Sequence, residues 1–166
     1  MSMGQILDGN KLALEIKKRL HQEVDLLRKS FNRVPVMVNV MIGEDHGSCA
    51  YAASQKRIAN EIGINYELVL LPKSISIDEL ISRIQNLNNN PDVNGIMIHK
   101  PVPSHIDYRL VANEVETKKD LEGINVTNIG KMIIGDTKII PCTPASVMEH
   151  IKSTKVNLSG KEAVIV

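Results

Sequence analysis

The stretch Pro35-Val-Met-Val-Asn-Val-Met-Ile42, followed by Gly43-Glu-Asp-His-Gly47, decides the fold of this chain. Residues 35–42 are mostly apolar and partly β-branched, which is typical of a buried strand. The polar segment between the two glycines predicts a loop, because glycine and short polar residues interrupt regular structure. Residues 48–62 then predict a helix that Gly63 ends.

Two further strands follow at the spacing of alternating α/β structure. Residues 64–71 and 94–98 predict strands, and residues 77–88 between them have the periodicity of a helix. Strand, helix, strand, helix and strand in this order indicate a parallel sheet with right-handed crossovers. We therefore predict an α/β fold of three layers, in which helices flank a parallel sheet.

The ends of the chain extend this pattern. An amphipathic helix is predicted over residues 9–29, because apolar residues recur there every three or four positions, at Leu12, Ile16, Leu20, Val24 and Leu27. Shorter helices are predicted over residues 107–113 and 145–152. Residues 157–160 predict a turn, and residues 161–166 predict the opening of one more buried strand.

Composition limits the class of protein. With 166 residues, 43% of them hydrophobic and 23% charged, the chain is expected to form one core. Lys and Arg number 20 against 19 Asp and Glu, so charge favours a small-molecule partner over nucleic acid. No apolar run approaches the ~18 residues of a membrane span, and no secretory signal is present. We expect a soluble intracellular protein with no membrane partner.

Several motifs occur in one order along the chain. They are Asp8-Gly9, Tyr51-Ala-Ala-Ser-Gln55, Gly95-Ile-Met-Ile-His99-Lys100-Pro101-Val102-Pro103, Lys119-Asp120-Leu121-Glu122-Gly123-Ile124-Asn125 and Pro141-Cys142-Thr143-Pro144. In order and approximate spacing they resemble the N-terminal, folate-binding catalytic domain of the bifunctional methylenetetrahydrofolate dehydrogenase/methenyltetrahydrofolate cyclohydrolase family. This resemblance covers nearly all of the chain.

The resemblance implies a division of the chain. Residues 1–158 would form the folate-binding catalytic domain, and residues 159–166 the first strand of a truncated Rossmann domain for NAD(P). No complete G-x-G-x-x-G motif is present, so NADP or NAD is expected only in the full-length protein and not in this fragment. A homodimer is expected of the full-length protein, in the cytoplasm or in mitochondria. Histidine and cysteine spacing predicts no metal site.

The resemblance also implies a reaction and a site for it. A hydride leaves the methylene carbon of methylenetetrahydrofolate for NAD(P), and water then opens the methenyl ring to 10-formyltetrahydrofolate. The site is expected at the C-terminal edge of the sheet, where open parallel sheets bind ligands. Tyr51 would pack against the pterin or the bridging ring. The implied folate-binding residues are Tyr51, Ala52, Ala53, Ser54, Gln55, Ile98, His99, Lys100 and Glu122, and the implied catalytic residues are Tyr51, Gln55 and His99.

This chain departs from the family pattern within that site. Gln55 stands where the family has its catalytic Lys, and a neutral amide can orient water but cannot exchange a proton near neutral pH. Lys56 should lie off the face shared by Tyr51 and Gln55, because one helical step rotates a side chain by roughly 100°. His99 stands at the family's Gln position, and Glu122 at the second Asp of its Lys-Asp-Val-Asp-Gly motif.

Each changed residue has more than one interpretation. Tyr51 can be an ordinary half-buried helix residue, and His99 can be either the replacement acid/base or a structural histidine. Glu122 can hold the polar edge of the pterin or be a solvated loop charge. Lys100 can be a surface lysine or can contact the glutamate tail of a folate.

These readings leave three hypotheses about function. In the first, the full-length protein is a working enzyme in which His99 replaces the Lys and Gln55 orients its ring. In the second, the chain is a folate-binding module whose catalysis has decayed and which serves binding or interaction in a longer protein. In the third, it is an α/β interaction domain without a ligand.

Overall fold

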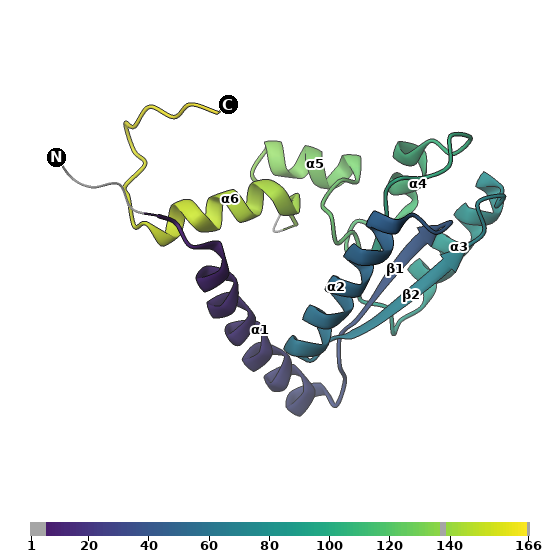
Figure 1. Cartoon of the computed structure of the whole chain (residues 1–166), viewed down its shortest axis with the longest axis horizontal. Helices are drawn as coiled ribbons and strands as arrows, with labels where there is room; N and C mark the ends of the chain where they lie inside the picture. The colour runs from purple at the N-terminus through teal and green to yellow at the C-terminus, as the bar shows by residue number, and fades with distance from the viewer. Residues whose placement is uncertain (1–5, 137–138, 166) are drawn as a thin grey trace.

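The computed structural model describes residues 6–136 and 139–165 and contains a parallel sheet of three strands (Figure 1). Strand β1 (Val36–Ile42) lies between β2 (Asn65–Leu71) and β3 (Gly95–Ile98), and both neighbours run parallel to it. In the described residues no helix is both long and apolar enough to cross a membrane.

Helices cover both faces of the sheet because successive side chains of β1 point to opposite faces. Val38, Val40 and Ile42 pack into the main apolar core with residues of α3 (Ile77–Asn89) and α4 (Tyr108–Glu114). Asn39 lies on the other face and contacts α2 (His46–Ile62). The predicted three-layer α/β architecture is confirmed.

Helix α2 carries the residues that matter most for the site, and local signals set its ends. Its N-cap is Asp45, whose carboxylate accepts a hydrogen bond from the backbone N–H of Ser48 at 2.9 Å. The helix therefore begins earlier than predicted, at His46. Its C-cap is Gly63 in the left-handed region with φ 82°, as the sequence predicts.

Helix α1 (Gly9–Phe31) extends away from the sheet and contacts α2 and α6 (Cys142–Ser153), as Figure 1 shows. Its predicted apolar face is only partly covered. Val24 is buried, whereas Leu27 remains 43% exposed. The helix is thus present as predicted, but it lies outside the main core.

Three further features of the structure differ from what the sequence predicts. Helix α5 (Val126–Ile133) was not predicted, and its N-cap is Asn125, the last residue of a quoted motif. Helix α6 begins at Cys142, so Pro144 lies in its first turn, where a missing N–H removes no helical hydrogen bond. The strand predicted over residues 161–166 is not formed over 161–165, because no neighbouring strand pairs with it, and residue 166 lies outside the described residues.

A buried lysine, Lys119, connects its own loop to the C-terminal end of α3. The Lys119 ammonium donates hydrogen bonds to the backbone carbonyls of Leu87, Asn88 and Asn90 at 3.1, 2.6 and 2.7 Å. These carbonyls stand at the C-terminus of the helix, where orphan acceptors and the helix dipole both favour a cation. Lys119 is therefore a helix-capping residue.

Replacing this ammonium should destabilise the fold. In Lys119→Met the three carbonyls lose a charged donor inside the protein, so the free energy of unfolding should fall by about 2 kcal/mol and the melting temperature by about 4–8 °C. Thermal unfolding followed by circular dichroism measures this change. The neighbouring Lys118→Met removes only an exposed contact with Glu116 and should change stability by less than ~0.5 kcal/mol. Equal effects of the two variants would contradict the capping role.

Candidate functional site

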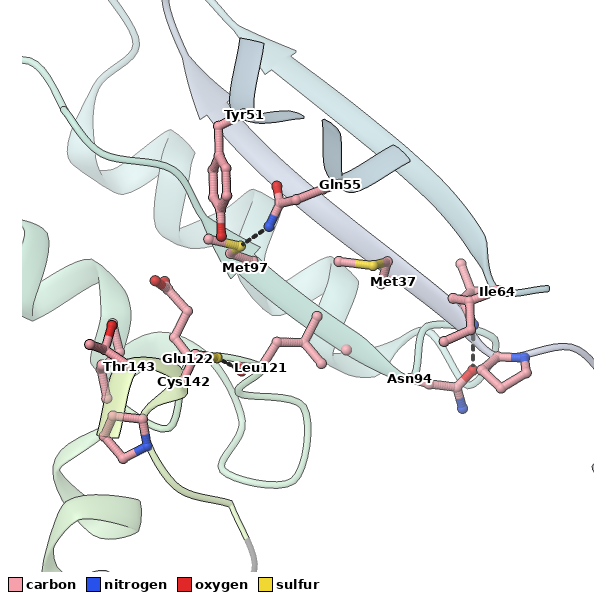
Figure 2. A pocket seen from close by; sticks show the side chains of 15 residues that line it. Met37, Tyr51, Gln55, Ile64, Asn94, Met97, Leu121, Glu122, Cys142 and Thr143 are labelled. Atoms are coloured by element: carbon pink, nitrogen blue, oxygen red, sulfur yellow. Dashed lines mark hydrogen bonds between the residues drawn. The ribbon is translucent and has the colours of Figure 1, made fainter. Parts of the chain in front are cut away.

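A cavity of about 520 Å³ lies between α2, the face of the sheet and the segments that contain Leu121 and Cys142 (Figure 2). It reaches from Tyr51 along the sheet to Pro35 and Asn94, which precede β1 and β3. The site was expected at the C-terminal edge of the sheet. The cavity instead extends along one face of the sheet, where the Leu121 side chain packs closely against Gly95.

Tyr51 and Gln55 both line the cavity from α2. Residues four apart on a helix lie on the same face, so a single helix presents both side chains. Lys56 is exposed and is not among the residues that line the cavity. This position of Lys56 is consistent with the prediction that it cannot replace Gln55 in the site.

Gln55 is held at both ends of its amide. Its Oε1 accepts a hydrogen bond from Asn39 Nδ2 at 2.7 Å, and its Nε2 donates to the Met97 sulfur at 3.1 Å. Figure 2 shows the amide group turned toward Met97 on the wall of the cavity. Because sulfur is a weak acceptor, this N–H remains available for a stronger acceptor in the cavity.

His99 lies behind the cavity rather than in it. Its side chain is 2% exposed, and its Nε2 lies 3.0 Å from Asn39 Nδ2. The ring of Tyr51 packs against it edge to face, with ring centroids 5.7 Å apart. Burial lowers the pKa of the His99 imidazole, because the charged form loses hydration. The structure therefore favours a neutral histidine covered by Tyr51.

Glu122 enters the cavity from the opposite side to Tyr51 (Figure 2). Its Oε2 accepts a hydrogen bond from the Tyr108 hydroxyl at 3.0 Å. Burial raises the pKa of the Glu122 carboxyl, whereas the Tyr108 hydroxyl and the nearby Lys100 ammonium act in the opposite direction. Glu122 is thus a partly buried carboxyl whose pKa is raised above that of a surface glutamate.

The remaining predicted binding residues lie elsewhere. Ala52 and Ile98 are 2% and 3% exposed and belong to the core. Ala53 and Ser54 do not line the cavity. Lys100 lines a separate depression, with its Nζ 3.9 Å from the centroid of the Tyr108 ring. A role in folate binding for these residues stays a prediction.

Asn39 is the site residue that the sequence analysis missed. It is fully buried in the central strand and contacts both Gln55 and His99. A signal was present, since asparagine is disfavoured in strands and is seldom buried without a specific partner. Its position within an otherwise apolar run indicates that its side chain has a specific hydrogen-bond partner in the folded protein.

Among the described residues there is neither a site that could hold a metal ion nor one that could hold a nicotinamide cofactor. They contain no cluster of three or more His, Cys, Asp or Glu side chains that could hold a metal ion. The chain also has no complete glycine-rich dinucleotide motif, so the residues present do not fit a nicotinamide cofactor.

Comparison with known proteins is consistent with this geometry. Residues 7–122 match the family described as tetrahydrofolate dehydrogenase/cyclohydrolase, catalytic domain. The chain is 40% identical over 162 residues to the bifunctional protein FolD of Wolbachia from Drosophila simulans, covering 97% of this chain and 56% of that protein. It is 35% identical to FolD of Clostridium botulinum, covering 98% of this chain and 58% of the relative. The chain thus spans somewhat over half the length of these curated relatives.

Solved structures of similar fold are described in the same terms. The bifunctional enzyme FolD of Campylobacter jejuni superposes with a TM-score of 0.89 at 30% identity, over 93% of this chain and 55% of that one. A methylenetetrahydrofolate dehydrogenase of the silkworm Bombyx mori has the same TM-score at 34% identity, over 93% and 53%. The match of the family model over most of the chain and these likenesses show that the chain belongs to the tetrahydrofolate dehydrogenase/cyclohydrolase family, with the fold of its catalytic domain.

Proposed function

We propose that this chain binds a reduced folate in the cavity beside Gln55 and forms the folate-binding part of a methylenetetrahydrofolate dehydrogenase/cyclohydrolase in one-carbon metabolism. The observation that carries the proposal is the pairing of Tyr51 and Glu122 across a largely apolar cavity. Tyr51 is 53% exposed, so part of its ring is free for a planar ligand. Glu122 offers a carboxyl to the polar edge of that ligand.

The charge of the cavity supports a cationic ligand in particular. The described lining residues include the carboxyl of Glu122 but no Lys or Arg. 5,10-Methenyltetrahydrofolate carries a positive charge on its bridging amidinium, so a lysine in place of Gln55 would repel this ligand and a carboxylate attracts it. The cavity therefore favours the ring-closed cation.

Hydride transfer and ring opening make different demands on the site. Hydride transfer requires mainly that the folate be held in position against the nicotinamide ring. That ring would be supplied by NADP or NAD in a longer protein, since the residues of this chain do not form a site for it. The homodimeric state of such a protein is a further prediction. Among the relatives, the Trypanosoma brucei enzyme is described as complexed with NADP cofactor and inhibitor.

Ring opening requires a group that moves a proton, and the site is poorly equipped for this step. The Gln55 amide cannot titrate near neutral pH. His99 is buried behind Tyr51, and its Nε2 is engaged by Asn39. These contacts argue against His99 as a replacement for the family lysine. We propose a domain that retains folate binding while its cyclohydrolase step is impaired.

Folate binding can be measured on the chain itself. Calorimetric titration with 5,10-methenyltetrahydrofolate should show saturable binding, and Tyr51→Ala should weaken it about tenfold, because stacking on an aromatic ring contributes roughly 1–3 kcal/mol. Phe31→Ala is the matched control, since Phe31 is 68% exposed and does not line this cavity. Absence of binding by the unmodified chain would contradict the proposed function.

The charge of Glu122 should make binding of the cation depend on pH. Because burial raises the pKa of this carboxyl, it gains a proton early as pH falls, and the attraction for the cation is then lost. Affinity should therefore decrease as the pH is lowered, and the decrease should begin at a higher pH than the titration of a surface glutamate would give. Glu122→Gln should bind more weakly at the higher pH and show a flat profile. Glu67→Gln, a change on the exposed side of β2, should keep the parent profile. A parent profile that is already flat would contradict the role of Glu122.

A further inference from the structure

Asn39 joins three secondary-structure elements and the residue after β3 at one buried point. Its Nδ2 lies 2.7 Å from Gln55 Oε1, 3.1 Å from the Tyr66 hydroxyl oxygen and 3.0 Å from His99 Nε2. These partners come from α2, from β2 and from the residue after β3, while Asn39 itself stands in β1. In the described part of the chain Gln55 and His99 share no direct hydrogen bond, and Asn39 contacts both of them.

The two ends of the Asn39 amide are used very differently. The nitrogen carries two hydrogens and has three polar neighbours. The oxygen is buried and has no hydrogen-bond partner in the described part of the chain. A buried acceptor without a partner is costly, and an apolar residue would avoid that cost in the centre of a sheet. The hydrogen-bond donors of Asn39 are therefore the part that the site uses.

The N–H donors of Asn39 determine which end of the Gln55 amide faces the cavity and which nitrogen of the His99 ring carries the proton. Because Asn39 donates to Gln55 Oε1, the other end of that amide, Nε2, is the end directed to Met97 at the cavity wall. Because an amide nitrogen can only donate, a hydrogen bond at the 3.0 Å contact with His99 requires Nε2 to be the unprotonated acceptor. The imidazole is then neutral and carries its proton on Nδ1.

We propose that Asn39 is a positioning residue for the folate site, which fixes Gln55 as a hydrogen-bond donor toward the ligand and fixes the tautomer of His99. The part of this inference that concerns the ligand rests on the proposed function. The part that concerns the histidine tautomer does not.

The tautomer provides a direct test. ¹⁵N NMR of the imidazole rings, recorded on the 166-residue chain at about pH 8, where imidazole is neutral, distinguishes a protonated from an unprotonated Nε2. The His99 signals are assigned by their loss in His99→Gln. In the unmodified chain Nε2 should be unprotonated. In Asn39→Asp, whose carboxylate only accepts, Nε2 should carry the proton.

Asn39→Asp places a charge in the core, which can prevent folding. A second variant, Asn39→Leu, therefore provides an independent test. Asn39→Leu has similar size and no donor, so Nε2 should gain a proton in part of the population. The same variant should bind 5,10-methenyltetrahydrofolate about three- to tenfold more weakly, the effect of losing one hydrogen bond that positions a ligand contact. Asn60→Asp, which places the same kind of change on the exposed side of α2, should alter neither measurement.

Two results would overturn the inference: a protonated Nε2 in the unmodified chain, or an identical ring state in the unmodified chain and in folded Asn39→Leu. Equal folate affinity of these two proteins would remove the role of Asn39 in positioning Gln55. If the unmodified chain binds no folate at all, the proposed function fails, while the nitrogen signals still decide whether Asn39 sets the His99 tautomer.

Discussion

A buried carboxylate beside the edge strand β3 holds the second wall of the cavity in place. Asp120 accepts hydrogen bonds from the backbone N–H groups of Glu122, Gly123 and Asn125 and from the side-chain amide of Asn128. A carboxylate that accepts several N–H bonds replaces the hydration lost on burial, and it fixes a loop that has no regular structure of its own. Without this constraint neither the carboxyl of Glu122 nor the start of α5 would have a defined position relative to the sheet. The shape of the cavity thus depends on a residue that does not line it.

The opposite wall is organised by hydrogen bonds between neutral side chains. Gln55 stands where the resemblance predicts a charged lysine, and its surroundings fit an amide. Asn39 donates a hydrogen bond to its oxygen, and its nitrogen donates to the weakly accepting sulfur of Met97. His99 is neutral and covered, so this wall carries no formal charge. A cavity with a neutral wall and one carboxyl is suited to retain a cationic ring. It is poorly suited to deliver or remove the proton that ring opening requires.

Periodicity predicted most of the fold, because the strands and the long helices have strong apolar patterns and clear end signals such as Gly63. Helix α5 escaped prediction because its start depends on Asn125, which is fixed by long-range contacts with Asn113 and Val115. In the site, the helical spacing of Tyr51 and Gln55 was sufficient to place them together.

Two features of the site depend on packing between segments far apart in the chain. The course of the cavity along the sheet follows from such packing, as does the role of Asn39, whose partners lie 16, 27 and 60 residues away. No local pattern encodes such separations. The polar residue within the apolar strand indicated that a partner existed, but it did not indicate which one.

The central claim is that this site binds 5,10-methenyltetrahydrofolate but does not carry out the proton transfer that opening of its ring requires. The most direct measurement is the absorbance decay of 5,10-methenyltetrahydrofolate as its ring opens, in the presence of the unmodified chain and of Gln55→Lys at equal ligand saturation. The account predicts that the unmodified chain leaves the rate at its value in buffer, whereas Gln55→Lys, which restores a titratable amine at the cavity wall, accelerates ring opening. Acceleration by the unmodified chain would contradict the account and would indicate that His99 or another group of the site acts as proton shuttle.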